Sequence, residues 1–161
     1  MEEIMSRRHR AEKREIEPDP LYGSVLLAKF INKVMEQGKK SCARRIVYGA
    51  LDEFSKRVKF ESPLEAFEEA LENAKPSLEV KSRRIGGATY QVPIEILPHR
   101  RTSMAMGWII DNARKKPGRS MKDALVAELT DCFNKQGSTI KKKDDTHRMA
   151  EANKAFAHYK W

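Results

Sequence analysis

The sequence has 161 residues, of which 34% are charged and 40% are hydrophobic, and its formal net charge is +9. This length suits one domain with a real core, and the hydrophobic content excludes a largely disordered chain. The excess positive charge indicates a polyanionic partner. Nucleic acid is the leading candidate because no long apolar stretch offers a membrane span, and a merely soluble basic protein is the alternative.

Neither metal binding nor catalysis is indicated by the motifs. Cys42 and Cys132 lie far apart, so both are interpreted as small apolar residues on the buried side of a helix, which favours a reducing compartment. The four histidines lack metal-ligand spacing, and no nucleophile or phosphate-loop motif is present. Residues 1–20 contain no apolar signal region, so we expect a cytosolic protein. We expect no enzyme activity, cofactor, metal or small-molecule substrate.

Two helices are predicted in the first part of the chain. Apolar residues at helical spacing follow Ser24, which can act as the N-cap, and Gly38 is the expected stop. A second helix begins at Ser41 and carries apolar residues on one side as far as Val58.

The third predicted helix has the clearest start signal. Ser62 can cap it, Pro63 fits the first helical position, Glu65 completes a capping box, and Pro76 ends it. Residues 62–75 contain four Glu and one Lys, so this helix is acidic while the rest of the chain is basic. We expect it to face away from nucleic acid or toward a basic protein neighbour.

Residues 78–96 predict two strands joined by Gly86 and Gly87. Apolar residues occupy even-numbered positions and polar residues occupy odd-numbered positions, and this period of two is typical of strands. The glycines permit positive φ in the turn. Pro93 cannot donate a ladder hydrogen bond and discourages the addition of another strand. We expect the base of this hairpin to pack on the helices while its basic tip projects toward a partner.

Three more helices are predicted after the hairpin. Pro98 precedes the fourth, and residues 115–120 end it. Trp108 is interpreted as a core residue of this helix, with a base-stacking platform as the alternative. Ser120 and Asp123 repeat the capping box and start a fifth helix that runs toward Gly137. The sixth is expected to start at the acidic residues that follow Lys143. Its apolar stripe is Met149, Ala152, Phe156 and Tyr159.

The expected fold is therefore mainly α: a six-helix domain with a protruding two-stranded β-hairpin between helices three and four. Residues 1–20 form a basic N-terminal arm, and residues 21–161 form a single helical RNA-binding domain that includes the hairpin at 78–96. The remaining basic residues cluster at helix ends, loops and the turn, where long cationic side chains can reach phosphates.

Two of these clusters have specific interpretations. Lys39 and Lys40 either contact RNA or complement the dipole at the end of the first helix. Arg100 and Arg101 would lie at the unfavourable N-terminal end of the fourth helix, which indicates an anionic partner.

Four runs resemble a known family: DPLYGSVLLAKFINKVMEQGKKS, LEAFEEALENAKPSLEVKSRRIGGATYQVPIEI, RRTSMAMGWIIDNARKK and THRMAEANKAFAHYKW. They are similar, in this order, to the bacterial form of the universal small-subunit ribosomal protein seven, from about Glu17 to Trp161. The family usually begins near the Ser-Arg-Arg run, so residues 1–4 are expected to be an extension, or Met5 the start.

The resemblance implies a ribosome-bound primary binder of small-subunit (16S) ribosomal RNA that nucleates assembly of the subunit head. It implies a position near the decoding region, exit-site tRNA, the mRNA path and neighbouring head and platform proteins. The residues expected to bind ribosomal RNA are Arg7, Arg8, Arg10, Lys39, Lys40, Arg100, Arg101, Arg114, Lys115, Lys116, Arg119, Lys141, Lys142, Lys143 and Arg148. The residues expected at the hairpin tip, toward exit-site tRNA or a neighbouring protein, are Lys81, Arg83, Arg84, Gly86 and Gly87.

Two other functions are compatible with the residues alone. A DNA-architectural protein could use the hairpin as a groove-binding arm. A protein-interaction module could use the acidic third helix.

Overall fold

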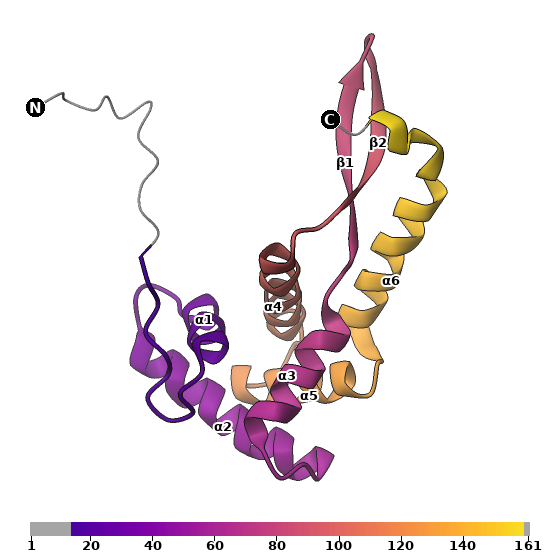
Figure 1. Ribbon diagram of the computed structural model, residues 1–161. Helices are drawn as coiled ribbons and strands as arrows, with labels where there is room; N and C mark the ends of the chain where they lie inside the picture. Colours follow the sequence, from indigo (N-terminus) through magenta and orange to yellow (C-terminus); the bar gives the residue numbers. More distant parts are fainter. Residues whose placement is uncertain (1–13, 160–161) are drawn as a thin grey trace, which may run out of the picture.

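The computed structural model describes residues 14–159, which form six α-helices, one 3-10 helix and one β-hairpin (Figure 1). This confirms the mainly α fold with a hairpin between the third and fourth helices. Within the described residues, no helix is both long and apolar enough to cross a membrane. The elements are α1 (Val25–Val34), α2 (Lys40–Val58), α3 (Pro63–Ala74), β1 (Leu78–Ile85), β2 (Ala88–Glu95), α4 (Pro98–Arg114), α5 (Met121–Phe133), α6 (Gly137–Ala152) and η1 (Lys154–Tyr159).

Three of the helices start at the serines that the sequence predicts as caps. The hydroxyl of Ser24 accepts a hydrogen bond from the amide of Leu27, and Ser62 and Ser120 accept the equivalent bonds in α3 and α5. Each cap satisfies one free amide of the first turn and contributes about 1 kcal/mol to stability. These helix starts are therefore specified by residues close together in the chain.

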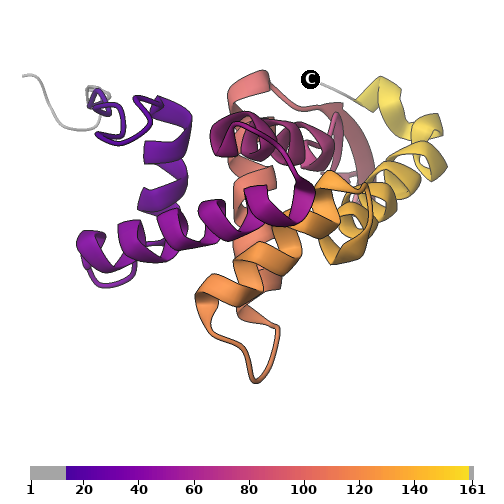
Figure 2. The same cartoon turned by 90° about the horizontal axis from the view of Figure 1, so that it is seen from below.

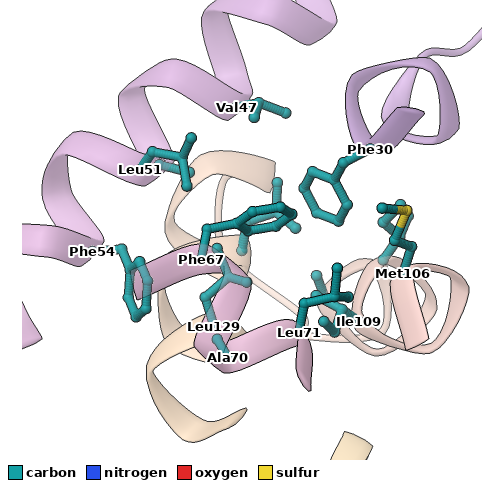
Figure 3. Close-up of a cluster of buried hydrophobic side chains, with 14 of the residues drawn as sticks. Phe30, Val47, Leu51, Phe54, Phe67, Ala70, Leu71, Met106, Ile109 and Leu129 are labelled. Carbon is teal, nitrogen blue, oxygen red and sulfur yellow. The ribbon is translucent and has the colours of Figure 1, made fainter. Parts of the chain in front are cut away.

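The core lies where α1 to α5 meet, and α5 contacts α2, α3, α4 and α6. Phe30 of α1 packs on Phe67 of α3 with ring centroids 5.0 Å apart, and Leu129 of α5 lies in the same cluster (Figure 3). Each fully buried side chain of this size contributes about 1.5–3 kcal/mol. The five helices therefore form one apolar core, and the hairpin and η1 lie outside it.

Cys42 and Cys132 have different environments. Cys132 is buried in α5 as predicted, and this burial, together with the nearby charge of Glu128, raises the pKa of its thiol to about 12. Cys42 is exposed in the first turn of α2, so the prediction that both cysteines are buried is wrong for Cys42. Its position one residue before the buried Ala43 places it at the edge of the apolar side of α2.

The hairpin strands are joined by a two-residue turn at Gly86 and Gly87, whose φ angles are +56° and +92°. Such a turn pairs even-numbered residues of β1 with odd-numbered residues of β2, so the apolar residues of the two strands lie on opposite faces. Glu79, at a position predicted to be polar, consequently shares a face with Val92 and is only 8% exposed. The alternation predicts the strands correctly but does not produce a single apolar face.

The C-terminal helix differs from its prediction. α6 starts at Gly137 and not at the acidic residues after Lys143, and its N-cap residue Gln136 makes no side-chain capping bond. The chain changes to a 3-10 helix at Lys154, so the expected apolar stripe does not hold, and Met149 is 53% exposed. The start of α6 is instead satisfied by a residue of another helix, described below.

The segment before α1 is attached to the helical body by Asp19. Its carboxylate accepts hydrogen bonds from the hydroxyl of Tyr48 at 2.7 Å and from the amides of Leu21 and Tyr22. Burial, followed by this bond to Asp19, raises the pKa of Tyr48 to about 12. The end of the predicted N-terminal arm is thus held on α2.

Candidate nucleic-acid interface

The acidic side chains of α3 lie away from the basic loop between α4 and α5. The carboxylates of α3 are exposed, and in the view of Figure 2 this helix lies on the other side of α2 from the loop between α4 and α5. The described basic residues predicted to bind RNA lie at the start of α2, at both ends of α4, in the α4–α5 loop and along α6, and those predicted at the tip lie on the hairpin. Arg7, Arg8 and Arg10 fall outside the described residues. The acidic residues of α3 are Glu65, Glu68, Glu69 and Glu72.

Lys39 and Lys40 lie at the N-terminus of α2, five and six residues after α1 has ended at Val34. They therefore do not complement the dipole of α1, and that alternative is wrong. At the positive end of α2, with no acidic residue in its first turn and no side-chain cap, both lysines are electrostatically unfavourable. Their ammonium groups make no hydrogen bond or ion pair within residues 14–159. An external anion would relieve this repulsion.

The four basic residues at the end of α4 and in the α4–α5 loop differ in their partners. Arg114 forms an ion pair with Glu36 at 2.9 Å, on an exposed part of the surface. Lys115 and Arg119 are exposed, and their side chains have no polar partner within the described part of the chain. Lys116 instead turns inward, so only three of this cluster face solvent.

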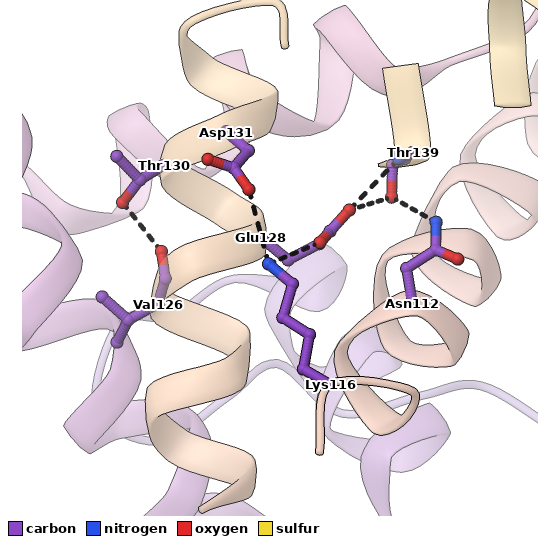
Figure 4. A network of polar contacts seen from close by, with 7 residues as sticks. All are labelled: Asn112, Lys116, Val126, Glu128, Thr130, Asp131 and Thr139. Atoms are coloured by element: carbon purple, nitrogen blue, oxygen red, sulfur yellow. Dashed lines mark hydrogen bonds and ion pairs between the residues drawn. The ribbon is translucent and has the colours of Figure 1, made fainter. Parts of the chain in front are cut away.

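Lys116 belongs to a buried polar network (Figure 4). Its ammonium lies 2.8 Å from Oε2 of Glu128, which is fully buried in α5 and has no hydrogen-bond partner at that oxygen beyond this ion pair. The other oxygen, Oε1, accepts bonds from the backbone amide of Thr139 at 3.1 Å and from its hydroxyl at 2.7 Å. Asn112 of α4 donates to the same hydroxyl. Glu128 thus caps α6, and Lys116 neutralises Glu128.

A groove between α1 and α4 contains basic residues that the sequence analysis did not single out. Lys29 and Lys33, one helical turn apart on α1, line it together with His99 of α4, around a volume of about 420 Å³. Lys33 donates to the carbonyl of Ser103, and burial lowers the pKa of its ammonium. The spacing of these lysines, opposite the apolar stripe of α1, is the signal that could have identified them.

A second region missed by the sequence analysis adjoins the start of α2. Arg14 and Arg44 line a hollow with Lys40, beside the segment that Asp19 attaches to α2. The Nε of Arg44 is buried and has no hydrogen-bond partner in the described chain. Glu15, Glu17 and Asp19 also line this hollow, so it carries both charges and does not extend the basic surface at the start of α2.

Arg100 and Arg101 have internal partners. Arg100 donates to the carboxylate of Glu79 at 3.0 Å, and Arg101 donates to the carbonyl of Ile96 at 2.7 Å. Burial opposes ionisation of Glu79, but the hydrogen bonds from Arg100 and then Lys81 outweigh it and lower the pKa of the carboxyl. Glu79 of β1 thus supplies part of the negative charge that was expected near the start of α4. These contacts also orient the base of the hairpin.

The basic residues of α6 lie along the helix and not before it. Lys141 is exposed and has no polar partner within residues 14–159, whereas the ammonium of Lys142 lies 5.3 Å from the ring centroid of half-buried Trp108. Lys143 donates to the carbonyl of Asn73, near the end of α3, at 2.6 Å. Arg148 forms only an exposed pair with Asp145 at 3.6 Å. The partly buried ring of Trp108 therefore makes a cation–π contact with the ammonium of Lys142.

Arg83, Arg84 and the two glycines are exposed at the end of the hairpin, which projects away from the helical core (Figure 1). Lys81 is also exposed but lies nearer the base, opposite Val92 and 3.4 Å from the carboxylate of Glu79. Tyr90 packs on Phe156 and Tyr159 of η1, with ring centroids 5.2 and 5.4 Å away. This aromatic contact gives Tyr90 and Tyr159 a packing role. It supports the hairpin below its tip and leaves the tip itself uncovered by the described chain.

α6 also contacts the base of the hairpin through His147. The amide of Ser77 donates to Nε2 of His147 at 3.0 Å, which requires that nitrogen to be unprotonated. Burial, and then the charge of Lys143, lowers the pKa of the imidazole. Beside His147 there is a hollow of about 530 Å³. It is lined by Leu78, Pro93 and Glu95 of the hairpin and by residues of α6 and η1.

Comparison with known proteins identifies the family of this chain. The family model described as ribosomal protein S7p/S5e matches residues 6–154. The chain is 78% identical to the small ribosomal subunit protein uS7 of Protochlamydia amoebophila, and 71% and 69% identical to those of Chlamydia trachomatis serovar L2 and Chlamydia pneumoniae. Each match covers 98% of this chain and 100% of the relative. The chain therefore belongs to the S7p/S5e family of ribosomal proteins, which are structural constituents of the small ribosomal subunit and not enzymes.

Proposed function

We propose that this protein is a primary binder of small-subunit (16S) ribosomal RNA that nucleates assembly of the subunit head. Its basic N-terminal arm, residues 1–20, and its helical domain, residues 21–161, bind the RNA together. In the assembled subunit it lies near the decoding region and the mRNA path. The hairpin tip approaches exit-site tRNA or a neighbouring protein.

The observation that carries the proposal is the set of exposed cations without internal partners. Lys39, Lys40, Lys115, Arg119 and Lys141 make no side-chain hydrogen bond or ion pair within residues 14–159, although acidic side chains are plentiful on α3. Cations that are held apart from carboxylates repel one another, and this repulsion destabilises the folded protein when no anion is bound. Phosphates of an RNA backbone would remove this repulsion and release counterions.

The paired cations fall into two groups in this proposal. Exposed pairs such as Arg114–Glu36 and Arg148–Asp145 contribute little to stability, so these arginines can exchange a carboxylate for a phosphate. Lys116 cannot do so, because its removal would leave Glu128 buried and uncompensated. We therefore assign Lys116 an indirect contribution to RNA binding, through the structure of the α4–α5 loop.

The hairpin and α6 present a different surface. The hollow beside His147 combines apolar walls from Leu78 and Pro93 with two carboxylates, of Glu95 and Glu151, and one ammonium group, of Lys154. Carboxylates disfavour an RNA backbone and suit a basic protein segment. We place a neighbouring head or platform protein at this hollow and RNA at the basic tip above it.

A salt titration with matched charge variants tests the proposal. Binding to a small-subunit ribosomal RNA transcript is measured by filter retention at several salt concentrations. The double variant Lys39→Gln/Lys40→Gln should reduce the log–log salt slope by about 1.4, from roughly 0.7 for each lost phosphate contact. A wild-type protein whose binding does not depend on salt would refute the proposal.

The control is Lys56→Gln/Lys59→Gln, which removes the same charge from the other end of α2. Lys56 lies 17 residues along the chain from Lys39, which is about 25 Å along a helix. This control should leave the salt slope unchanged. Equal effects of the two double variants would mean that net charge, and not the surface at the start of α2, determines binding.

A further inference from the structure

A pocket of about 360 Å³ lies between the end of α1, the first half of α2 and the junction of α4 with α5. Its walls are apolar, from Val34 of α1, Ala43 and Ile46 of α2, and Met121 of α5. Cys42, the exposed cysteine, also lines it. The volume lies at the low end of the roughly 300–1,000 Å³ typical of small-molecule sites, which suits a single ring system and not a polymer segment.

The rim of this pocket is polar and carries both charges. Glu36 and Gln37 line it from the α1–α2 loop, and Lys39 and Arg114 line it from α2 and α4. The ion pair between Glu36 and Arg114 lies at the edge, where the carboxylate is largely exposed and can accept further hydrogen bonds. The pocket therefore offers apolar walls to a flat ring and a carboxylate to donors at the edge of that ring.

Unpaired cations lie on both sides of this rim. Lys39 and Lys40 lie on the side of α2, and Lys115 and Arg119 lie in the loop between the lining residues Arg114 and Met121. In Figure 2 the start of α2 lies at the left end of that helix and the α4–α5 loop projects below it, and residues next to both line the pocket. A ligand with a ring in the pocket and negative charges on either side of that ring would match this arrangement.

We propose that this pocket binds one unstacked base of the RNA. The inference rests on the proposed RNA-binding function and adds a base-specific contact to it. RNA is read mainly at unpaired bases that leave the stack, and their hydrogen-bonding edges and flat faces are what such pockets recognise. The phosphates on either side of the base contact Lys39 and Lys40 on one flank and Lys115 and Arg119 on the other. Glu36 favours a base with an amino group, because a carboxylate accepts hydrogen bonds and cannot donate them.

The test fills the pocket without changing the charge of the protein. Cys42→Trp places a large side chain at the lining position, and Cys42→Ser is the matched variant that leaves the pocket open. Each protein is bound to a small-subunit ribosomal RNA transcript. Base edges are probed with dimethyl sulfate and a carbodiimide, and the RNA backbone is probed with hydroxyl radicals.

The expected result distinguishes a contact with an RNA base from contacts with the RNA backbone. Cys42→Trp should bind at least about fivefold more weakly, because each 1 kcal/mol of lost base contact changes the affinity about fivefold. It should lose protection of one base edge and keep both the backbone footprint and the salt slope. Cys42→Ser should match the wild type.

A second route avoids any folding defect of the tryptophan variant. Folded wild-type protein is alkylated with N-phenylmaleimide, which reaches exposed Cys42 but not buried Cys132 with its raised pKa. The bulky adduct should reproduce the effect of tryptophan, and Cys42→Ser protein treated in the same way should be unaffected.

Two outcomes would overturn the inference. One is a filled pocket that leaves every base edge protected and the affinity unchanged. The other is a loss of affinity together with the backbone footprint, because phosphate contacts and not a base would then have been removed. Absence of salt-dependent binding by the wild type is a separate result, which refutes the proposed function itself.

Discussion

Lys116, two residues after the end of α4, neutralises Glu128 of α5 across 2.8 Å, although its neighbours in the same basic run face solvent. The carboxylate in turn supplies the cap that α6 lacks in its own sequence. A residue that resembles an RNA contact therefore holds three helices together. This arrangement separates stability from RNA binding within one cluster of four cations.

Replacing Lys116 by methionine should destabilise the protein by about 3 kcal/mol, because the charge of Glu128 would remain buried without a partner. Urea unfolding followed by circular dichroism measures this loss. The control Lys115→Met should change stability by less than about 0.5 kcal/mol and should instead reduce the salt slope of RNA binding. Equal stability of the two variants would contradict the assigned role of Lys116.

Glu79→Gln should destabilise the hairpin base by about 1–2 kcal/mol at neutral pH, because a charged hydrogen bond to Arg100 is weakened. The pKa of Glu79 is lowered in the folded protein, so its contribution is complete above the unfolded pKa of about 4.3 and is lost as pH falls through the folded pKa. Unfolding curves at pH 7 and in acid should show the difference between wild type and variant shrinking. The control is Glu95→Gln at an exposed position of β2; an equal loss there would argue against the Arg100 contact.

His147 predicts a pH dependence near neutrality. Its pKa is lowered in the folded state, so the unfolded chain binds the proton more readily, and stability should decrease as pH falls from 7.5 to 5. Protonation also removes the acceptor for the amide of Ser77, and nearby Lys143 disfavours the added charge while Asp144 favours it. Thermal melts of His147→Gln should lack this component, whereas His99→Gln at an exposed site should keep it. A variant with the wild-type pH profile would exclude His147 as the source.

Shortening the hairpin should show that its tip contributes to function and not to the stability of the fold. Replacing residues 84–89 by two glycines removes the end of the hairpin beyond the pair of Arg83 with Tyr90 and keeps the strand register. The variant should keep a cooperative melt within about 1 kcal/mol of the wild type, since surface residues contribute little to stability. Binding to ribosomal RNA should be largely kept, and exit-site tRNA occupancy in reconstituted subunits should change. Loss of the cooperative melt would show that the tip stabilises the helical core.

Local signals in the sequence predicted the helix starts that depend on neighbouring residues. Ser24, Ser62 and Ser120 each cap an amide three residues away, so the cap and its target are read together. The start of α6 could not be predicted in this way, because its capping carboxylate is Glu128, eleven residues before the amide that it accepts. The Gly-Gly turn was likewise predicted from adjacent residues. The burial of Glu79 was not, because it depends on how the two strands pair.

The basic surface shows the same division. Net charge and the positions of lysine and arginine clusters indicated a polyanionic partner, since composition and the order of residues are enough for that inference. Only the tertiary structure distinguished the unpaired ammonium of Lys40 from the buried ion pair of Lys116, and brought the α1–α2 loop beside the start of α5 to form a pocket. Burial and pairing arise from contacts between residues far apart in the chain, and those contacts decide which charges remain available to a partner.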